Sequence, residues 1–465
     1  MAYVGVATSL HTRGTLRVPT SDWSRPDSTS ALMLWPPGYP AAIAIPMMTG
    51  APAIQSARVV NVFAAAVTAF VVTLLVAGAV GTPAGVVAAL VVFTTPAIFD
   101  VHLSVLSEPL FIAILTLALA TFVYARDGLF RLGVIGAAAV MTRYVGGSVA
   151  AAAVLWTLAD QRYAWRRRFW RAVAVAAIPA LVLGAWIART AMAKDRHGDM
   201  VLAIYGRWSV TIGQMRDTLA QWLAPLAPEG LMRGTVAALL GFILFILVIS
   251  TMRDTASSRF RQRPAELIAR IISASWVLIA CYLGVACAAR LLVGGTIPFD
   301  WRILSPVIVL LEIMIVVSVA HWWRAYHRPV HVLVSVLALA WIGMAASVTF
   351  NDAYAAATDG SDFAAEEWRM SPLIAWVQQN GRGHTLYSNW PPAVYFHAHR
   401  IARELPDSTD VRESLTEFGT VFRASNGVIV GFNERSPDVV APDSIAGLLG
   451  LHPLARLQDG TVWGP

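Results

Sequence analysis

The sequence is poor in charged residues and in cysteine. Only 14% of its 465 residues are charged and 57% are hydrophobic, whereas soluble domains carry about 25% charged residues. The mean hydropathy of +0.60 agrees with this composition, so a soluble globular protein is excluded. The two cysteines, Cys281 and Cys287, lie in one apolar segment, which excludes a disulfide framework elsewhere in the chain.

The sequence also lacks the short motifs of many enzymes and transporters. It contains no HExxH, GxSxG, P-loop or GxGxxG motif and no pair of CxxC motifs. Its two halves show no obvious repeat, which argues against many secondary transporters. The formal net charge is +7, and the arginine excess lies in short loops between apolar runs, for example at 166–168. We interpret it as a signal for membrane orientation and expect no nucleic-acid partner.

Apolar segments of membrane-crossing length dominate the middle of the chain. They lie at about 57–80, 84–99, 106–124, 171–188, 234–251, 267–289, 303–321 and 330–350. Arg143 interrupts a further apolar region at 129–160, which we interpret as a hairpin of two short or tilted crossings. The sequence therefore predicts an α-helical polytopic membrane protein with about ten spans.

The positions of the arginines predict how these spans are oriented. Arginine is concentrated near 125–131, 159–171, 252–266 and 322–329, and such loops face the cytoplasm. We therefore expect a multi-pass protein of the bacterial inner membrane, in contact with the lipid bilayer and with both chain ends outside the cytoplasm. No apolar run precedes the first outer loop, so we expect one more span upstream of Met1, giving eleven in a complete chain.

Three regions follow from this pattern. Residues 1–56 form a first outer loop with an interfacial segment, in which Trp35–Pro40 predicts a stiff, non-helical turn. Residues 57–350 form the transmembrane domain. Residues 351–465 have the composition of a small α/β domain outside the cytoplasm, with helices predicted at 372–380 and 443–449 and strands at 385–388 and 427–432.

Acidic and basic side chains near the outer membrane ends are the candidates for chemistry. Asp100, His102 and Glu108 cluster where two apolar segments meet. A charged group at a helix centre costs about 2.5–3.5 kcal/mol on insertion scales, so such groups commonly mark functional sites. A carboxylate there could take a proton from an acceptor hydroxyl. The alternative is that Asp100 and His102 are solvated loop residues and Glu108 caps a helix.

Four arginines on the same side are candidates for binding a phosphate, because the planar guanidinium suits bidentate bonds to phosphate oxygens. They are Arg143, Arg189, Arg207 and Arg302. Each has an alternative: Arg143 snorkels to the headgroups, Arg189 and Arg207 are ordinary loop residues, and Arg302 pairs with Asp300 at a helix end. Glu312 lies within an apolar span, where it either faces a cavity or pairs internally.

Four short motifs in order resemble those of a known family. They are Trp35–Pro40, Ser107–Leu110, Thr142–Gly146 and Asp300–Pro306. In this respect the chain resembles the polytopic glycosyltransferases of the GT-C fold, close to the dolichyl-phosphate-mannose protein mannosyltransferase and aminoarabinose transferase group, glycosyltransferase family 39. The resemblance implies transfer of a sugar from a polyprenyl-phosphate carrier to a lipid, glycan or protein acceptor on the outer face of the membrane.

The same resemblance places a catalytic aspartate just after the first membrane helix, immediately upstream of a segment like Tyr3–Leu10. This sequence begins at Met1, and Asp22 and Asp27 lie too far along the chain to match. We predict a glycosyltransferase that uses Glu108, Asp100 and His102 for catalysis and the four arginines for the donor phosphate. A divalent metal is possible, although no ligand spacing is evident. The alternative is a protein that binds or transports a lipid-linked sugar without transferring it.

Overall fold

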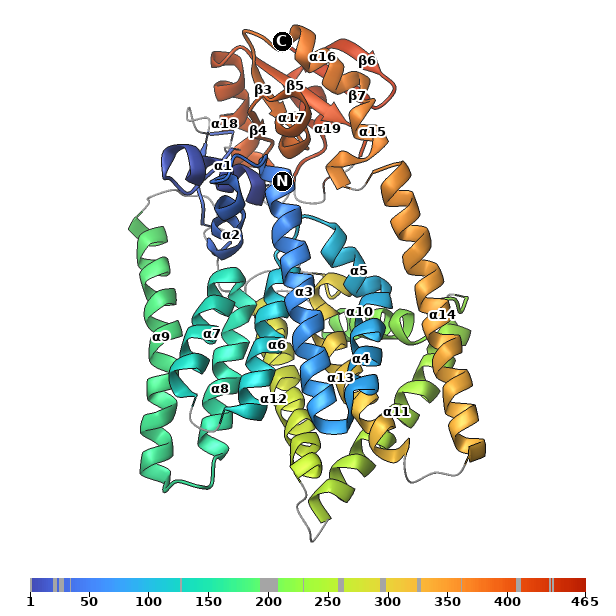
Figure 1. Ribbon diagram of the computed structural model, residues 1–465. Coiled ribbons are helices and arrows are strands. Elements are labelled where there is room, and N and C mark those ends of the chain that lie inside the picture. Colours follow the sequence, from blue (N-terminus) through green and yellow to red (C-terminus); the bar gives the residue numbers. More distant parts are fainter. Residues whose placement is uncertain are drawn as a thin grey trace.

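A computed structural model describes residues 2–19, 23–24, 29–33, 35–125, 128–192, 208–228, 230–257, 263–292, 298–323, 328–360, 362–406, 411–434, 436 and 439–465. The described chain forms a tall helical bundle with a small α/β region at one end, and both chain termini lie at that end (Figure 1). The predicted fold class, a polytopic helical membrane protein with a C-terminal α/β domain, is confirmed.

The helices of the bundle match the apolar segments of the sequence, with their ends shifted by a few residues. They are α3 (Ala53–Val80), α4 (Thr82–Thr94), α5 (Pro96–Leu103), α6 (Glu108–Tyr124), α7 (Leu129–Thr142), α8 (Gly147–Ala159), α9 (Trp165–Met192), α10 (Trp208–Leu223), α11 (Leu231–Ser257), α12 (Arg263–Leu292), α13 (Trp301–Trp323) and α14 (Arg328–Thr358). Among the described residues, six of these helices are individually long and apolar enough to cross a membrane. The chain is thus a multi-pass membrane protein, while the exact number of spans stays a prediction.

Two details of the bundle differ from the prediction. The segment 84–99 is not one straight helix, because α4 and α5 meet at Thr95 with a bend of 67°. Pro96 explains the break, since the residue before a proline avoids the helical conformation and Thr95 is extended. The helix α10, which lies in the predicted outer loop, was not anticipated, because its sequence is only weakly apolar.

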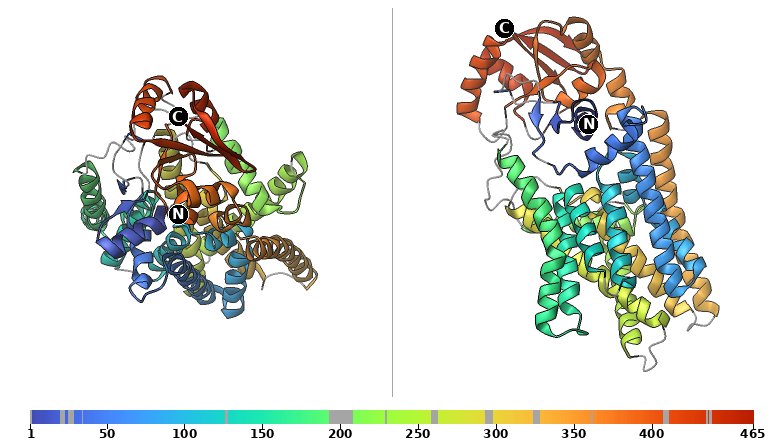
Figure 2. Two further views of the ribbon diagram at one scale, coloured as in Figure 1. Left: turned by 90° about the horizontal axis from the view of Figure 1, so that it is seen from above. Right: turned by 60° about the vertical axis from the view of Figure 1, so that its left-hand side comes forward.

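The N-terminal region is more helical than the sequence indicates. It contains α1 (Ala2–Arg13), a short antiparallel pair of β1 (Arg17–Val18) and β2 (Ser30–Ala31), and α2 (Gly38–Met47). The prediction of a non-helical turn is wrong from Gly38 onward. Pro40 falls in the first turn of α2, where a helix tolerates proline because that backbone position needs no donor. Figures 1 and 2 show α1 and α2 between the bundle and the C-terminal region.

The C-terminal region is a five-stranded mixed sheet of order β4-β3-β5-β7-β6, in which β4, β3 and β5 are parallel and β7 and β6 are antiparallel additions. Its strands are β3 (Thr385–Ser388), β4 (Ala402–Glu404), β5 (Gly427–Phe432), β6 (His452–Leu457) and β7 (Gly460–Gly464). Its helical elements are η2 (Asp362–Ala364), α15 (Glu366–Arg369), α16 (Pro372–Asn380), α17 (Pro391–Ala398), α18 (Val411–Ala424) and α19 (Pro442–Leu449).

The predicted elements of this region are confirmed, because its turn and capping residues are local signals. The Ser371 hydroxyl accepts a hydrogen bond from the backbone N–H of Ile374 and so caps α16. The strand β5 is buried along its whole length, as a continuous apolar run predicts. The first loop also packs here, since the rings of Trp23 and Phe418 meet edge to face at 5.6 Å.

Candidate functional site

The centre of the candidate site is the carboxylate of Glu108, the first residue of α6. Glu108 is 1% exposed. Its Oε1 lies 2.5 Å from Nη1 of Arg143 and 3.3 Å from Nη2 of Arg302. These residues come from three different helix ends, α6, the end of α7 and the start of α13. A buried charge needs a partner of opposite sign, and here one carboxylate has two.

Arg143 reaches Glu108 because the predicted hairpin breaks at this residue. Its backbone is extended (φ −150°, ψ 140°) between α7 and the short 3-10 helix η1 (Tyr144–Gly146). A side chain at Gly146 would place its Cβ 2.1 Å from the backbone oxygen of Ala139, so only glycine permits so tight a return. The region 129–160 therefore forms a helical hairpin as predicted, while the crossing of the membrane by its two helices stays a prediction. The Arg143 side chain is only 15% exposed and points into the protein, not to the surface.

A serine and a tyrosine complete the polar contacts around Glu108. Arg143 Nη1 donates to the Ser107 hydroxyl at 3.2 Å, and that hydroxyl donates to Glu108 Oε2 at 3.4 Å. The Ser107 hydroxyl has a single proton, which the bond to Glu108 uses. The Tyr3 hydroxyl is therefore the donor in its hydrogen bond of 3.3 Å with the Ser107 hydroxyl. The N-terminal helix α1 thus contributes directly to the site, a role that the sequence did not reveal.

Aromatic side chains from the first loop cover this cluster. The ring of Tyr3 lies 5.6 Å from that of Trp35 and meets Tyr39 edge to face at 5.1 Å. Tyr39 is fully buried and donates to Asn61 Oδ1 at 2.9 Å. Burial raises the pKa of both Tyr3 and Tyr39, so both phenols stay neutral near pH 7. A Cβ at Gly38 would lie 2.5 Å from the Met141 carbonyl, so glycine here lets α2 pack against α7.

Arg302 is the more exposed of the two cations. Its side chain is 42% exposed, and both Nε and Nη2 lie 3.3 Å from Glu108 Oε1. These contacts do not support the alternative that Arg302 forms a salt bridge with Asp300 at a helix end. The Asp300 carboxylate instead accepts from the backbone N–H groups of Arg302 and Ile303, each at 3.1 Å, and so caps α13.

The structure does not bring Asp100 and His102 to Glu108. Both lie on α5, and His102 Nδ1 lies 2.7 Å from the carbonyl oxygen of Ile98, one turn earlier on the same helix. The His102 ring packs edge to face on Phe93 at 5.2 Å. Their catalytic role remains a prediction from sequence that no contact with Glu108 supports.

The other two predicted arginines are also separate from this cluster. Arg189 donates to the Leu32 carbonyl at 2.7 Å and stacks on Trp186, so it holds the first loop to α9. Arg207 lies outside the described residues. Glu312, whose surroundings the sequence left open, pairs internally: its Oε1 accepts from Thr95 at 2.5 Å and from Trp222 at 3.1 Å.

The described residues of the site do not suit a divalent cation. Glu108 is the carboxylate in the cluster, and two guanidinium groups already occupy its Oε1. A cation there would be repelled by both arginines. Among the described residues, no group of three or more His, Cys, Asp or Glu side chains is placed to hold a metal ion.

Two solved structures resemble this protein in fold. The ArnT structure from Cupriavidus metallidurans bound to undecaprenyl phosphate superposes with a TM-score of 0.56 and 13% identity, covering 99% of this chain and 92% of that one. The Archaeoglobus fulgidus oligosaccharyltransferase in complex with Zn and sulfate superposes with a TM-score of 0.53 and 14% identity, covering 92% and 63%. The chain has the GT-C fold.

At this level of identity the likeness establishes the GT-C fold and leaves the reaction open. No protein-family model matches the sequence, and no curated protein sequence matches it either. The expectation of a GT-C architecture, which rested on four short motifs, is confirmed. Three of those motifs supply Glu108, Arg143 and Arg302, and the fourth supplies Trp35 and Tyr39. Apart from Tyr3, the residues that form and cover the Glu108 cluster therefore come from these four motifs.

Proposed function

We propose that this protein is a membrane glycosyltransferase that moves a sugar from a polyprenyl-phosphate carrier to an acceptor. The observation that carries the proposal is the convergence of Arg143 and Arg302 on the buried Glu108. The GT-C fold supports it, because one GT-C neighbour was solved with undecaprenyl phosphate bound.

Within this proposal, the two arginines have different tasks. Arg143 is buried and fixed by Glu108 and Ser107, so it sets the positive charge of the site. Arg302 is nearly half exposed, and its contacts with Glu108 use Nε and Nη2. A guanidinium carries five N–H donors, so Arg302 can bind a phosphate oxygen while it stays paired.

The proposed transfer forms a bond between an acceptor oxygen and the anomeric carbon while the bond from that carbon to the carrier phosphate breaks. Negative charge then collects on the departing phosphate, where a positioned arginine stabilises it most. The acceptor proton can pass to an oxygen of that phosphate. Glu108, enclosed by two guanidinium groups, acts in this scheme by positioning them and not as the base.

A binding or transport function without transfer is the second candidate. The observation that favours it is that both arginines engage Glu108, so the described cluster offers cations for a phosphate but no side-chain base for an acceptor. The two candidates differ in whether the carrier is released from its sugar.

The deciding experiment measures that release. Purified protein in proteoliposomes is given a polyprenyl-phosphate sugar together with an envelope extract as the acceptor source, and free polyprenyl phosphate is counted by mass spectrometry. The proposal predicts release by the wild type, at least a tenfold loss with Arg302→Gln, and no change with Arg216→Gln, which removes an arginine that is 73% exposed. Carrier binding without release by the wild type would favour the second candidate.

A further inference from the structure

The helix α10 is joined to α13 by a stripe of side chains on one of its faces. Gln214, Thr218 and Trp222 follow one another at intervals of four residues, so they lie on the same side of α10. Trp222 donates to Glu312 within α13, and the other two bind the residue Phe299 just before that helix begins. One face of α10 is therefore bonded to α13 and to its approach.

The contacts of Gln214 and Thr218 hold both backbone groups of Phe299. The Phe299 N–H donates to Gln214 Oε1 at 3.3 Å, and the Phe299 carbonyl oxygen accepts from the Thr218 hydroxyl at 3.0 Å. The Phe299 side chain is fully buried. Buried backbone groups require such partners, because an unpaired one costs free energy. Two side chains one turn apart on α10 therefore fix the chain at this point.

From Phe299 the chain leads directly to Arg302, and other side chains hold that connection. The Asp300 carboxylate accepts from the backbone N–H groups of Arg302 and Ile303. Tyr282 of α12, which is buried, donates to the Ile303 carbonyl oxygen at 2.7 Å. The backbone from which the Arg302 side chain extends is thus fixed by α10 on one side and by α12 on the other.

The Arg302 side chain itself is held less tightly than that of Arg143. It is 42% exposed and lies 3.3 Å from Glu108 Oε1, whereas Arg143 is 15% exposed and reaches the same oxygen at 2.5 Å. Charge-assisted N–H···O bonds are ordinarily about 2.7–2.9 Å long. A shift in the start of α13 would therefore separate Arg302 from Glu108 and leave the pair of Glu108 with Arg143 in place.

We propose that Gln214 and Thr218 are positioning residues, which hold Arg302 beside Glu108 by binding the backbone of Phe299. Their effect on the carrier rests on the proposed function, in which Arg302 binds the carrier phosphate. Neither residue needs to contact the carrier, since each acts through the place at which α13 begins.

The competing account is that α10 only adds stability to the bundle. Thr218→Val separates the two accounts, because valine has the shape and nearly the helix propensity of threonine but cannot donate to Phe299. Thr211→Val is a matched control on the same helix. Thr211 is buried, and its hydroxyl has no hydrogen-bond partner among the described residues.

The first test measures the position of Arg302 without any lipid. Purified protein is treated with the arginine-selective reagent phenylglyoxal, and the modification rate of each arginine is measured by peptide mass spectrometry. We expect Arg302 to react about threefold faster or more in Thr218→Val, as for the loss of one hydrogen bond. Arg143 should keep its rate in this variant, and Thr211→Val should behave as the wild type.

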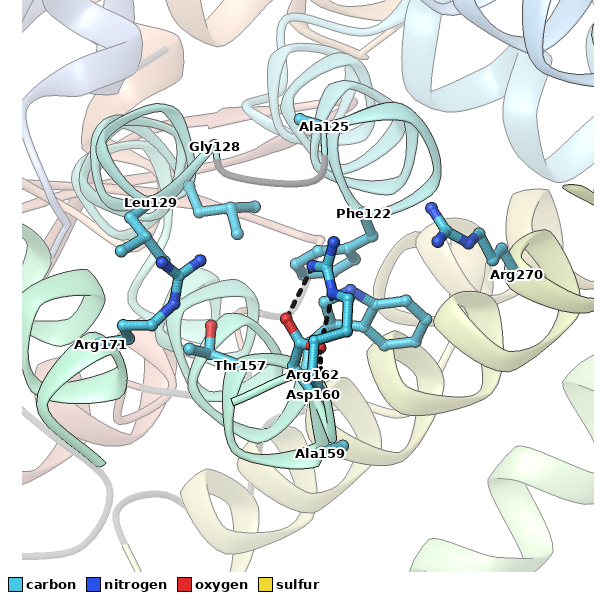
Figure 3. A pocket seen from close by; sticks show the side chains of 12 residues that line it. Phe122, Ala125, Gly128, Leu129, Thr157, Ala159, Asp160, Arg162, Arg171 and Arg270 are labelled. Atoms are coloured by element: carbon cyan, nitrogen blue, oxygen red, sulfur yellow. Dashed lines mark hydrogen bonds and ion pairs between the residues drawn. The ribbon is translucent and has the colours of Figure 1, made fainter. Parts of the chain in front are cut away.

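Arg162 provides a remote reference within the same protein. Its side chain is 47% exposed and pairs with Asp160 at 2.7 Å, so it resembles Arg302 in exposure and pairing. It lies beside a cavity of about 190 Å³ at the end of α6 far from Glu108 (Figure 3). Its rate should be the same in all variants.

The second test is the affinity for undecaprenyl phosphate, measured by native mass spectrometry. Thr218→Val should weaken binding about threefold or more in the wild-type background. It should cause no further loss when combined with Arg302→Gln, because that variant lacks the side chain that Thr218 positions.

The two tests distinguish failure of this proposal from failure of the proposed function. Faster modification of Arg302 in Thr218→Val, in a protein whose wild type does not bind undecaprenyl phosphate, would support the positioning role and contradict the proposed function. An unchanged rate at Arg302, or equal increases at Arg302 and Arg143, would overturn the positioning role whether or not the carrier binds.

Discussion

The Glu108 carboxylate and the Arg143 guanidinium, 35 positions apart in the sequence, meet at 2.5 Å inside the protein. Both residues stand next to helix breaks, and both are withdrawn from water. This ion pair joins the start of α6 to the end of α7, and Arg302 then joins the start of α13 to the same carboxylate. The cluster consequently links three helices, and we propose that its two arginines also bind the carrier phosphate.

The first prediction concerns stability. Glu108→Gln keeps the shape of the side chain but leaves two arginines without their counter-charge, and breaking a buried pair in this way costs about 3–5 kcal/mol. We expect a clearly lower unfolding midpoint in detergent. Asp217→Asn is the control, because Asp217 is 69% exposed and pairs with a surface arginine; its midpoint should stay close to the wild type. An unchanged midpoint for Glu108→Gln would mean that the pair contributes no net stability.

The second prediction separates the possible roles of Arg143. A snorkelling arginine is replaced by lysine without loss, but Arg143 is buried and bonded to both Glu108 and Ser107. Lysine keeps the charge and cannot reproduce the planar geometry, so Arg143→Lys should lose about 1.5–3 kcal/mol, the contribution of a hydrogen bond to a charged group. Unfolding midpoints measure the loss. Arg58→Lys is a suitable comparison at an exposed position and should have no effect.

The sequence was sufficient to predict that Glu108, Arg143 and Arg302 belong to the site, but not that they pair with one another. An arginine inside an apolar run and a glutamate just before a helix-starting proline are local anomalies, and both proved to be buried. Which of the nearby charges meet depends on how the helices pack, which no local pattern encodes. Asp100 and His102 are close to Glu108 along the chain, yet α5 ends at Leu103 and a new helix starts at Glu108.

There is also a physical reason why the sequence did not indicate the role of Tyr3. Tyr3 lies in a helix with little apolar periodicity, so nothing in its sequence indicates that it covers a site 104 residues further on. The four predicted elements of the C-terminal region, at 372–380, 385–388, 427–432 and 443–449, were by contrast predictable because capping serines, prolines and β-branched runs act over a few residues.

The third prediction concerns membrane orientation. The helix ends that flank the arginine-rich segments lie at one end of the bundle, and the C-terminal sheet lies at the opposite end (Figure 1). We expect the sheet outside the cytoplasm. Single cysteines at Gln161 and Thr420, both exposed, are introduced after Cys281 and Cys287 are changed to alanine. In intact cells an impermeant maleimide should label the Thr420→Cys protein and spare the Gln161→Cys protein. The reverse pattern would invert the topology.

The fourth prediction is a dependence on alkaline pH. Burial raises the pKa of Tyr3 and Tyr39 above the ordinary value, which is about 10. The unfolded chain therefore releases these protons first, so stability is complete below about pH 10 and falls as the pH rises toward the folded-state pKa values. Unfolding midpoints should stay level from about pH 8 to about pH 10 and decline above that value, with a shallower decline for Tyr3→Phe. Equal slopes in both proteins would show that Tyr3 is not buried as the structure places it.

The most direct test of the central claim is the affinity for the carrier phosphate itself. Binding of undecaprenyl phosphate to the wild type, Arg302→Gln and Arg216→Gln proteins can be compared by native mass spectrometry at equal lipid concentration. The account predicts saturable binding by the wild type, a loss of at least tenfold with Arg302→Gln, and an unchanged affinity with Arg216→Gln. Equal affinity in all three proteins would contradict the assignment of the Glu108, Arg143 and Arg302 cluster as the phosphate site.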